Sequence, residues 1–161
     1  MNGDPSNNGM GEIVQTVARW LRGLILVYGI SVVLYGHLSP GGGFEGGVVI
    51  ASGFILLTLA GGEQQGQRFF SRRMALAFGS AGLLIFLVLA LVGMGRPDGA
   101  FLKNVIGTSE PAWFTLFSGG VIPLLNIAIG LLVASLLFLV FTLLATLGAA
   151  AENENPEGDD L

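Results

Sequence analysis

The run Gly120 to Gly148 reads GVIPLLNIAIGLLVASLLFLVFTLLATLG and contains no charged side chain over 29 residues. Its polar side chains are Asn126, Ser135, Thr142 and Thr146. A helix needs about 20 predominantly apolar residues to cross the hydrocarbon core of a bilayer. A second charge-free run, Met74 to Gly95, is 22 residues long. The two runs therefore predict transmembrane helices over residues 120–148 and 74–95.

Two further apolar segments carry a charge near one end. Residues 13–36 contain Arg19 and Arg22 in their first turns, where long basic side chains can reach the membrane surface. Residues 44–60 contain Glu45 near the start and, at 17 residues, are a marginal span. We predict an all-α integral membrane protein with four transmembrane helices.

The composition supports this class of protein. Of the 161 residues, 52% are hydrophobic and 11% are charged, whereas soluble domains carry about 25% charged residues. The chain has no cysteine and one histidine, which excludes disulfides and thiolate metal sites and makes a metal site built from histidines of this chain implausible. No basic cluster lies beside stacking aromatic residues, so we expect a lipid bilayer and no nucleic acid as partner.

The charges also divide the chain and orient it. Residues 1–12 are polar and predict a disordered tail, residues 13–150 form the four-helix domain, and residues 151–161 hold five acidic residues and no basic one. Four spans place both termini on the same side of the membrane. Five basic residues flank the spans on that side, and two flank them on the other side. The positive-inside rule then predicts cytoplasmic termini. The five are Arg19, Arg22, Arg68, Arg72 and Arg73, and the two are Arg96 and Lys103.

The connection between the first two spans is the most unusual segment. It reads GHLSPGGGFEGG over residues 36–47, with six glycines, the only histidine and a carboxylate. Pro40 cannot continue the preceding helix, and Gly41 to Gly43 permit positive φ angles and close backbone approach. We predict that residues Pro40 to Gly47 break the backbone near the membrane surface. Carbonyl groups exposed there could coordinate Na⁺, as unwound segments do in some transporters.

Small residues continue into the second span at a spacing of four. Gly43, Gly47 and Ala51 form one stripe, and Gly42 and Gly46 repeat it one position earlier. Such stripes allow membrane helices to pack closely, and we predict that this one packs against a neighbouring subunit. The residues predicted to break a helix or to pack on another subunit are Pro40, Gly41, Gly42, Gly43, Phe44, Gly46, Gly47, Ala51 and Pro123.

Ionisable residues inside a membrane protein are candidates for function. His37 and Glu45 are therefore candidates for a cation or proton path. The alternative role for His37 is to hold backbone groups of the glycine-rich loop. The alternative for Glu45 is an exposed acid at a helix N-terminus, where the helix dipole favours it.

Residues 36–47 resemble the signature of the MrpB (MnhB) subunit family of multisubunit Na⁺/H⁺ antiporters. Nine of the 12 positions match the run Gly-His-x-x-Pro-Gly-Gly-Gly-Phe-x-Gly-Gly of that family. Residues 120–130 are similar to the start of its last helix, and the resemblance extends over about residues 14–148. Asn126 is a third candidate for the cation path. The family often has an acidic residue at this position, and this chain departs from that pattern with a neutral amide.

The resemblance implies a small accessory subunit that is not an enzyme by itself. It implies other integral membrane subunits as partners, including large antiporter-like ones, in a prokaryotic cell membrane. The transported ions would be Na⁺ and H⁺, and no cofactor is expected on this chain. Two alternatives stay open: the same subunit within an ion-pumping membrane-bound hydrogenase or related respiratory complex, and an assembly protein with no ion path.

Overall fold

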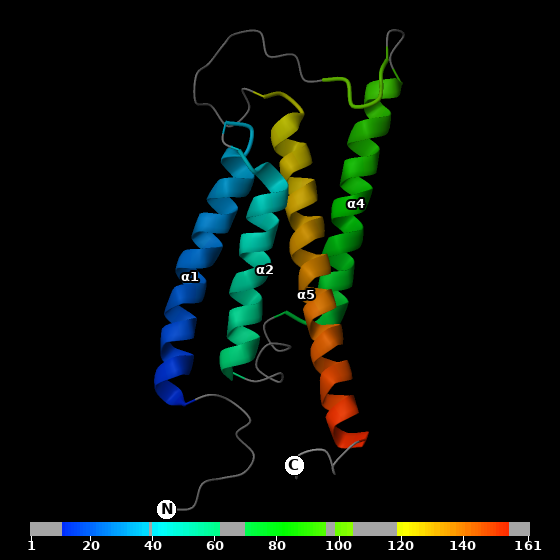
Figure 1. The fold of residues 1–161 in the computed structure, drawn as a ribbon. Coiled ribbons are helices and arrows are strands. Elements are labelled where there is room, and N and C mark those ends of the chain that lie inside the picture. The colour runs from blue at the N-terminus through cyan, green and yellow to red at the C-terminus, as the bar shows by residue number, and fades with distance from the viewer. Residues whose placement is uncertain (1–10, 39, 62–69, 96–98, 105–118, 155–161) are drawn as a thin grey trace, which may run out of the picture.

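The computed structural model describes residues 11–38, 40–61, 70–95, 99–104 and 119–154. Within these residues the chain forms four long α-helices (Figure 1). They are α1 (Glu12–Tyr35), α2 (Gly42–Gly61), α4 (Arg72–Met94) and α5 (Ile122–Glu154). Each is long and apolar enough to cross a membrane. Within the described residues, the prediction of an all-helical, multi-pass membrane protein is therefore confirmed, with four helices as candidate spans.

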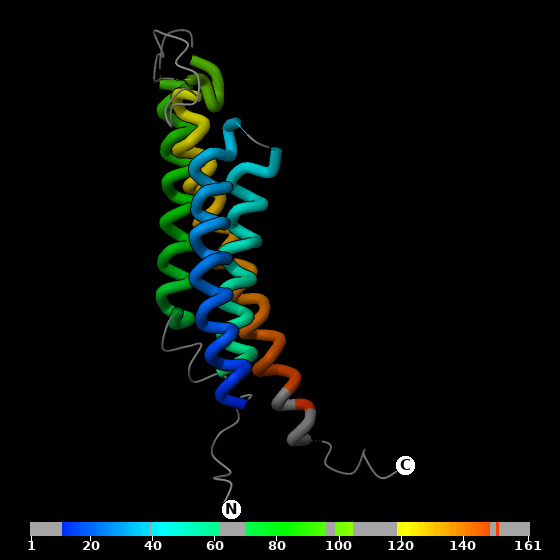
Figure 2. Tube along the Cα trace, turned by 90° about the vertical axis from the view of Figure 1, so that its left-hand side faces the viewer, coloured from blue at the N-terminus to red at the C-terminus, as the bar shows by residue number. Residues whose placement is uncertain are grey.

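The helices do not pack in the order of the chain. α2 lies between α1 and α5, and α4 packs against the far side of α5, so the bundle has the order α1, α2, α5, α4 (Figures 1 and 2). The start of α1 and the end of α5 lie at the same end of the bundle. This follows from an even number of spans, and the assignment of that end to the cytoplasm stays a prediction.

The interfaces between helices are built from small residues. Eight residues of α2 are buried and nearly all of them are glycine or alanine, whereas Leu24 of α1 and Leu84 of α4 are exposed. Lipid tails are as apolar as leucine, so membrane helices gain stability from close backbone packing instead of from hiding large side chains. The buried residues of α2 are Gly42, Gly43, Gly46, Gly47, Ala51, Gly53, Leu57 and Ala60.

An aromatic cluster lies between α2, α4 and α5 at one end of the bundle. Phe138 of α5 is 2% exposed, and its ring meets Phe70 edge-on at a centroid distance of 5.1 Å. Phe54 of α2 stacks on Phe70 at 4.9 Å, and Phe78 of α4 lies parallel to Phe70 at 6.0 Å. The cluster joins α2, α4 and α5 at the end of the bundle where α4 begins.

Four helix boundaries differ from the prediction by more than one residue. α4 begins at Arg72 and not at residue 74, and α5 begins at Ile122 and not at residue 120. α2 begins at Gly42 and not at residue 44. α5 continues to Glu154, six residues past the predicted end at 148, because residues 149–151 are alanines with the highest helix propensity. The first four residues of the predicted acidic tail are therefore helical. Residues 1–10 and 155–161, which hold the rest of the two predicted tails, lie outside the described residues.

Candidate functional site

The turn between α1 and α2 is shorter than the predicted break. Gly41 and Gly42 have φ angles of 111° and 55°, which glycine adopts without steric cost. From Gly42 onward the backbone is helical, and the Glu45 N–H already donates to the Gly41 carbonyl at 3.3 Å. The prediction of a break through Gly47 is therefore wrong beyond Gly42, because the carbonyls that follow belong to the hydrogen-bonding pattern of α2.

One face of α2 lies directly on the backbone of α5. A Cβ atom built on Gly43 would overlap the carbonyl oxygen of Asn126 and lie 2.9 Å from its Cα. A Cβ on Gly47 would lie 2.8 Å from the Gly130 carbonyl oxygen. Real Cβ atoms essentially never come this close to a neighbouring backbone. Glycine at both positions is what allows the two helices to meet.

The opposite face of α2 lies on α1. A Cβ on Gly46 would lie 2.9 Å from the Gly29 carbonyl oxygen, and a Cβ on Gly29 would lie 3.2 Å from the Gly46 carbonyl oxygen. The two glycines therefore face each other across the interface.

The small residues of α2 are covered by the chain's own helices. This corrects the prediction that Gly42, Gly43, Gly46, Gly47 and Ala51 pack against a neighbouring subunit, since all five are buried between α1 and α5. Of the other residues in that predicted set, Phe44 is 62% exposed and Pro40 and Gly41 are exposed in the turn. Pro123 is fully buried at the second position of α5, where its fixed φ suits a helix start.

Asn126 lies at the point where α2 begins. A Cβ on Gly42 would lie 3.1 Å from the Asn126 Oδ1, so the amide packs against the first residue of α2. The Asn126 Nδ2 is buried and has no hydrogen-bond partner among the described residues. An unpaired buried amide costs about 1–3 kcal/mol. This nitrogen is a hydrogen-bond donor, so it is satisfied by an acceptor such as a water molecule or a carbonyl group and not by a cation.

His37 and Glu45 lie near the same turn but touch different residues. The half-buried His37 packs beside Gly119, so that a Cβ on Gly119 would lie 3.4 Å from the His37 Cδ2. The exposed Glu45 folds its carboxylate back over Gly41. The turn and the start of α5 thus gather all three candidates at one end of the bundle. Among the described residues, no three His, Asp or Glu side chains come together as a metal site would require.

The partner glycines on α1 and α5 were not predicted. Gly29 and Gly130 have no other glycine three or four residues away, so neither forms the spacing pattern that is seen in α2. A contact just before α5 was also not predicted from the sequence. The Asn104 Oδ1 accepts a hydrogen bond there from the Val121 N–H at 3.2 Å. Gly120, directly before Val121, has a φ angle of 62°, a conformation that glycine adopts without steric cost.

Comparison with known proteins places this architecture in a family. Residues 13–139 match the model of a domain related to the MnhB subunit of Na⁺/H⁺ antiporters. The chain belongs to the MnhB family. The resemblance seen in residues 36–47 is therefore confirmed. In this MnhB domain, that segment forms the α1–α2 turn and both packed faces at the start of α2.

Two relatives show how far the similarity extends. The chain is 34% identical over 117 residues to a Na⁺/H⁺ antiporter subunit from Bacillus subtilis, covering 68% of this chain and 80% of that protein. It is 37% identical over 130 residues to an uncharacterized protein of Methanocaldococcus jannaschii, covering 76% of this chain. The chain spans about half, 49%, of the length of that archaeal relative.

Proposed function

We propose that this chain is an accessory membrane subunit of a Mrp-type Na⁺/H⁺ antiporter that supports assembly of the complex and contributes to its cation path. The observation that carries the proposal is the MnhB match over residues 13–139, which includes the entire packed bundle except the last turns of α5. The Bacillus subtilis relative is named as an antiporter subunit, which favours the antiporter over a hydrogenase-linked complex.

The chain needs partners to transport ions. Residues 74–94 of α4 and the candidate span Ile122–Gly148 of α5 contain no ionisable side chain, whereas proton paths through membranes use titratable groups. Other integral membrane subunits, including large antiporter-like ones, would supply these groups. The exposed apolar side chains of α1 and α4 offer surface both to lipid and to such subunits.

The contribution to the cation path would come from the end of the bundle where α1 meets α2. Asn126 supports this assignment because its Oδ1, the amide atom that can bind a cation, lies beside a helix start made of glycine. His37 and Glu45 lie around the same turn. The ions carried by the complex would be Na⁺ and H⁺, with no cofactor on this chain.

Co-purification separates the proposal from its main alternative. An affinity-tagged full-length chain, extracted in mild detergent from its native prokaryotic membrane, is expected to bring large antiporter-like subunits, as identified by mass spectrometry. Nickel–iron or iron–sulfur subunits in stoichiometric amounts would contradict the antiporter assignment and support the hydrogenase-linked complex. A chain that purifies alone from the same membranes would contradict both.

Sidedness can be tested cleanly because the chain has no cysteine. If the termini are cytoplasmic, Gly11 lies inside the cell. Ala100, which is exposed between α4 and α5, then lies outside the cell. In intact cells, a membrane-impermeant maleimide is expected to label Ala100→Cys and to label Gly11→Cys only after permeabilisation. The reverse pattern would show that the charge count misassigns the two sides.

A further inference from the structure

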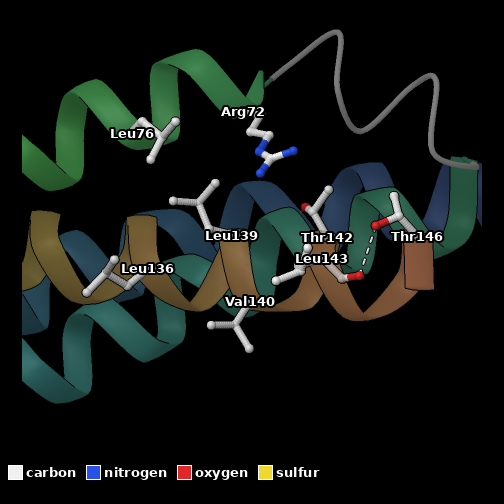
Figure 3. A pocket seen from close by; sticks show the side chains of 8 residues that line it. All are labelled: Arg72, Leu76, Leu136, Leu139, Val140, Thr142, Leu143 and Thr146. Carbon is white, nitrogen blue, oxygen red and sulfur yellow. Dashed lines mark hydrogen bonds between the residues drawn. The ribbon is translucent and has the colours of Figure 1, made fainter. Parts of the chain in front are cut away.

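A groove with a charged mouth lies between α4 and α5 at the end of the bundle where α4 begins. Its cavity volume is about 390 Å³. Figure 3 shows Arg72 reaching from α4 toward α5, with apolar side chains of both helices beside it. The lining residues are Arg72, Leu76, Leu136, Leu139, Val140, Thr142, Leu143 and Thr146.

The groove is polarised along its length. Arg72 is the first residue of α4 and supplies the only charge among the lining residues. The hydroxyls of Thr142 and Thr146 donate to carbonyls of their own helix, to Phe138 at 2.9 Å and to Leu143 at 2.9 Å. The groove therefore has a cationic end at the helix terminus and an apolar body toward the middle of the bundle.

The N-terminus of α4 adds to the positive end. The Ser71 side chain accepts a hydrogen bond from the Met74 N–H at 3.3 Å, and the remaining N–H groups of the first turn carry the positive end of the helix dipole. The acidic residues Glu152 and Glu154 follow six and eight residues beyond Thr146, past the end of the groove. A negatively charged group is thus favoured beside Arg72.

We propose that this groove binds an anionic phospholipid, with its phosphate on Arg72 and one acyl chain between α4 and α5. The direction of the groove matches a lipid, because its charge lies at the helix end and its apolar body extends inward. From Leu136 to Thr146 the groove follows about 15 Å of helix, which suits an acyl chain. Under the predicted orientation, this end faces the cytoplasmic leaflet, where anionic lipids attract basic residues.

Lipid binding at this groove does not depend on which complex the chain joins. It can be tested on the full-length chain, purified with its accompanying subunits, in nanodiscs. The probes are phosphatidylglycerol and phosphatidylcholine, each with a diazirine on one acyl chain. After photolysis and peptide mapping, phosphatidylglycerol is expected to label the segments around Leu76 and residues 136–143 at least five-fold more than phosphatidylcholine.

Two variants and one control sharpen the test. Arg72→Gln is expected to reduce phosphatidylglycerol labelling to the phosphatidylcholine level, and Leu143→Trp, which fills the groove, is expected to abolish it. Arg73→Gln removes the same charge at a position that does not line the groove, and is expected to change labelling less than two-fold.

Three results would overturn the proposal. The first is equal labelling by the two lipids, and the second is an Arg72→Gln variant that labels as well as the unmodified chain. The third is a cross-link from the groove to another subunit in place of lipid, which would identify the groove as a protein interface.

Discussion

Replacing Gly43 with alanine is expected to destabilise the chain by about 3 kcal/mol, the upper end of the cost of overpacking. The new methyl group would overlap the Asn126 carbonyl oxygen and approach the Asn126 Cα to 2.9 Å. Both obstacles are backbone atoms of a helix and cannot rotate away, so α2 and α5 must separate. For a chain of this size, the thermal midpoint should fall by roughly 10 °C, measured by circular dichroism in detergent.

Gly23→Ala is the matched control. Gly23 lies in α1 with no atom within 4 Å of an added Cβ, and alanine favours the helix by about 1 kcal/mol. Its thermal midpoint is expected to stay unchanged or to rise. If Gly43→Ala melted like Gly23→Ala, the backbones of α2 and α5 could not be in direct contact at Gly43.

Replacing Asn126 with leucine is expected to separate stability from transport. Leucine is similar in size and removes a buried Nδ2 that has no partner among the described residues, so the thermal midpoint should stay the same or rise. If the amide serves the cation path, sodium-dependent proton exchange in membrane vesicles should nevertheless fall at least ten-fold. Asn126→Asp, which keeps a side-chain oxygen at this position, is expected to retain exchange.

Ser135→Ala is the control for this variant. Ser135 is 1% exposed and its hydroxyl also lacks a partner among the described residues, but it packs near Gly79 between α4 and α5. Its removal should leave exchange unchanged. Full exchange in Asn126→Leu would remove Asn126 from the cation path and favour a purely structural role for this end of the bundle.

The number of helices and their approximate limits follow from the sequence because charge is excluded from membrane spans. The uninterrupted apolar runs before Gly95 and Gly148 are enough to predict α4 and the membrane part of α5. The order of the helices in the bundle does not follow. Hydropathy shows how apolar each span is, but it carries no information about which span lies beside which.

In the glycine-rich segment, too, the sequence predicts one feature of the packing and not the other. Its spacing correctly indicates close packing, but Gly43 and Gly46 meet different helices. Neither partner glycine, Gly29 or Gly130, has another glycine three or four residues away. A pattern on one helix cannot show whether the covering helix belongs to the same chain. The same limit applies to Arg72. The sequence shows a charge near a span, and only the structure places that charge at the mouth of a groove.

Whether the chain is a working part of a Na⁺/H⁺ antiporter can be tested by measuring sodium-dependent proton exchange in inverted membrane vesicles from a strain that lacks this gene. Deletion is expected to abolish the exchange while the other subunits stay in the membrane, and expression of the intact chain should restore it. Exchange that continues unchanged in the deletion strain would show that the chain is not a working part of a Na⁺/H⁺ antiporter.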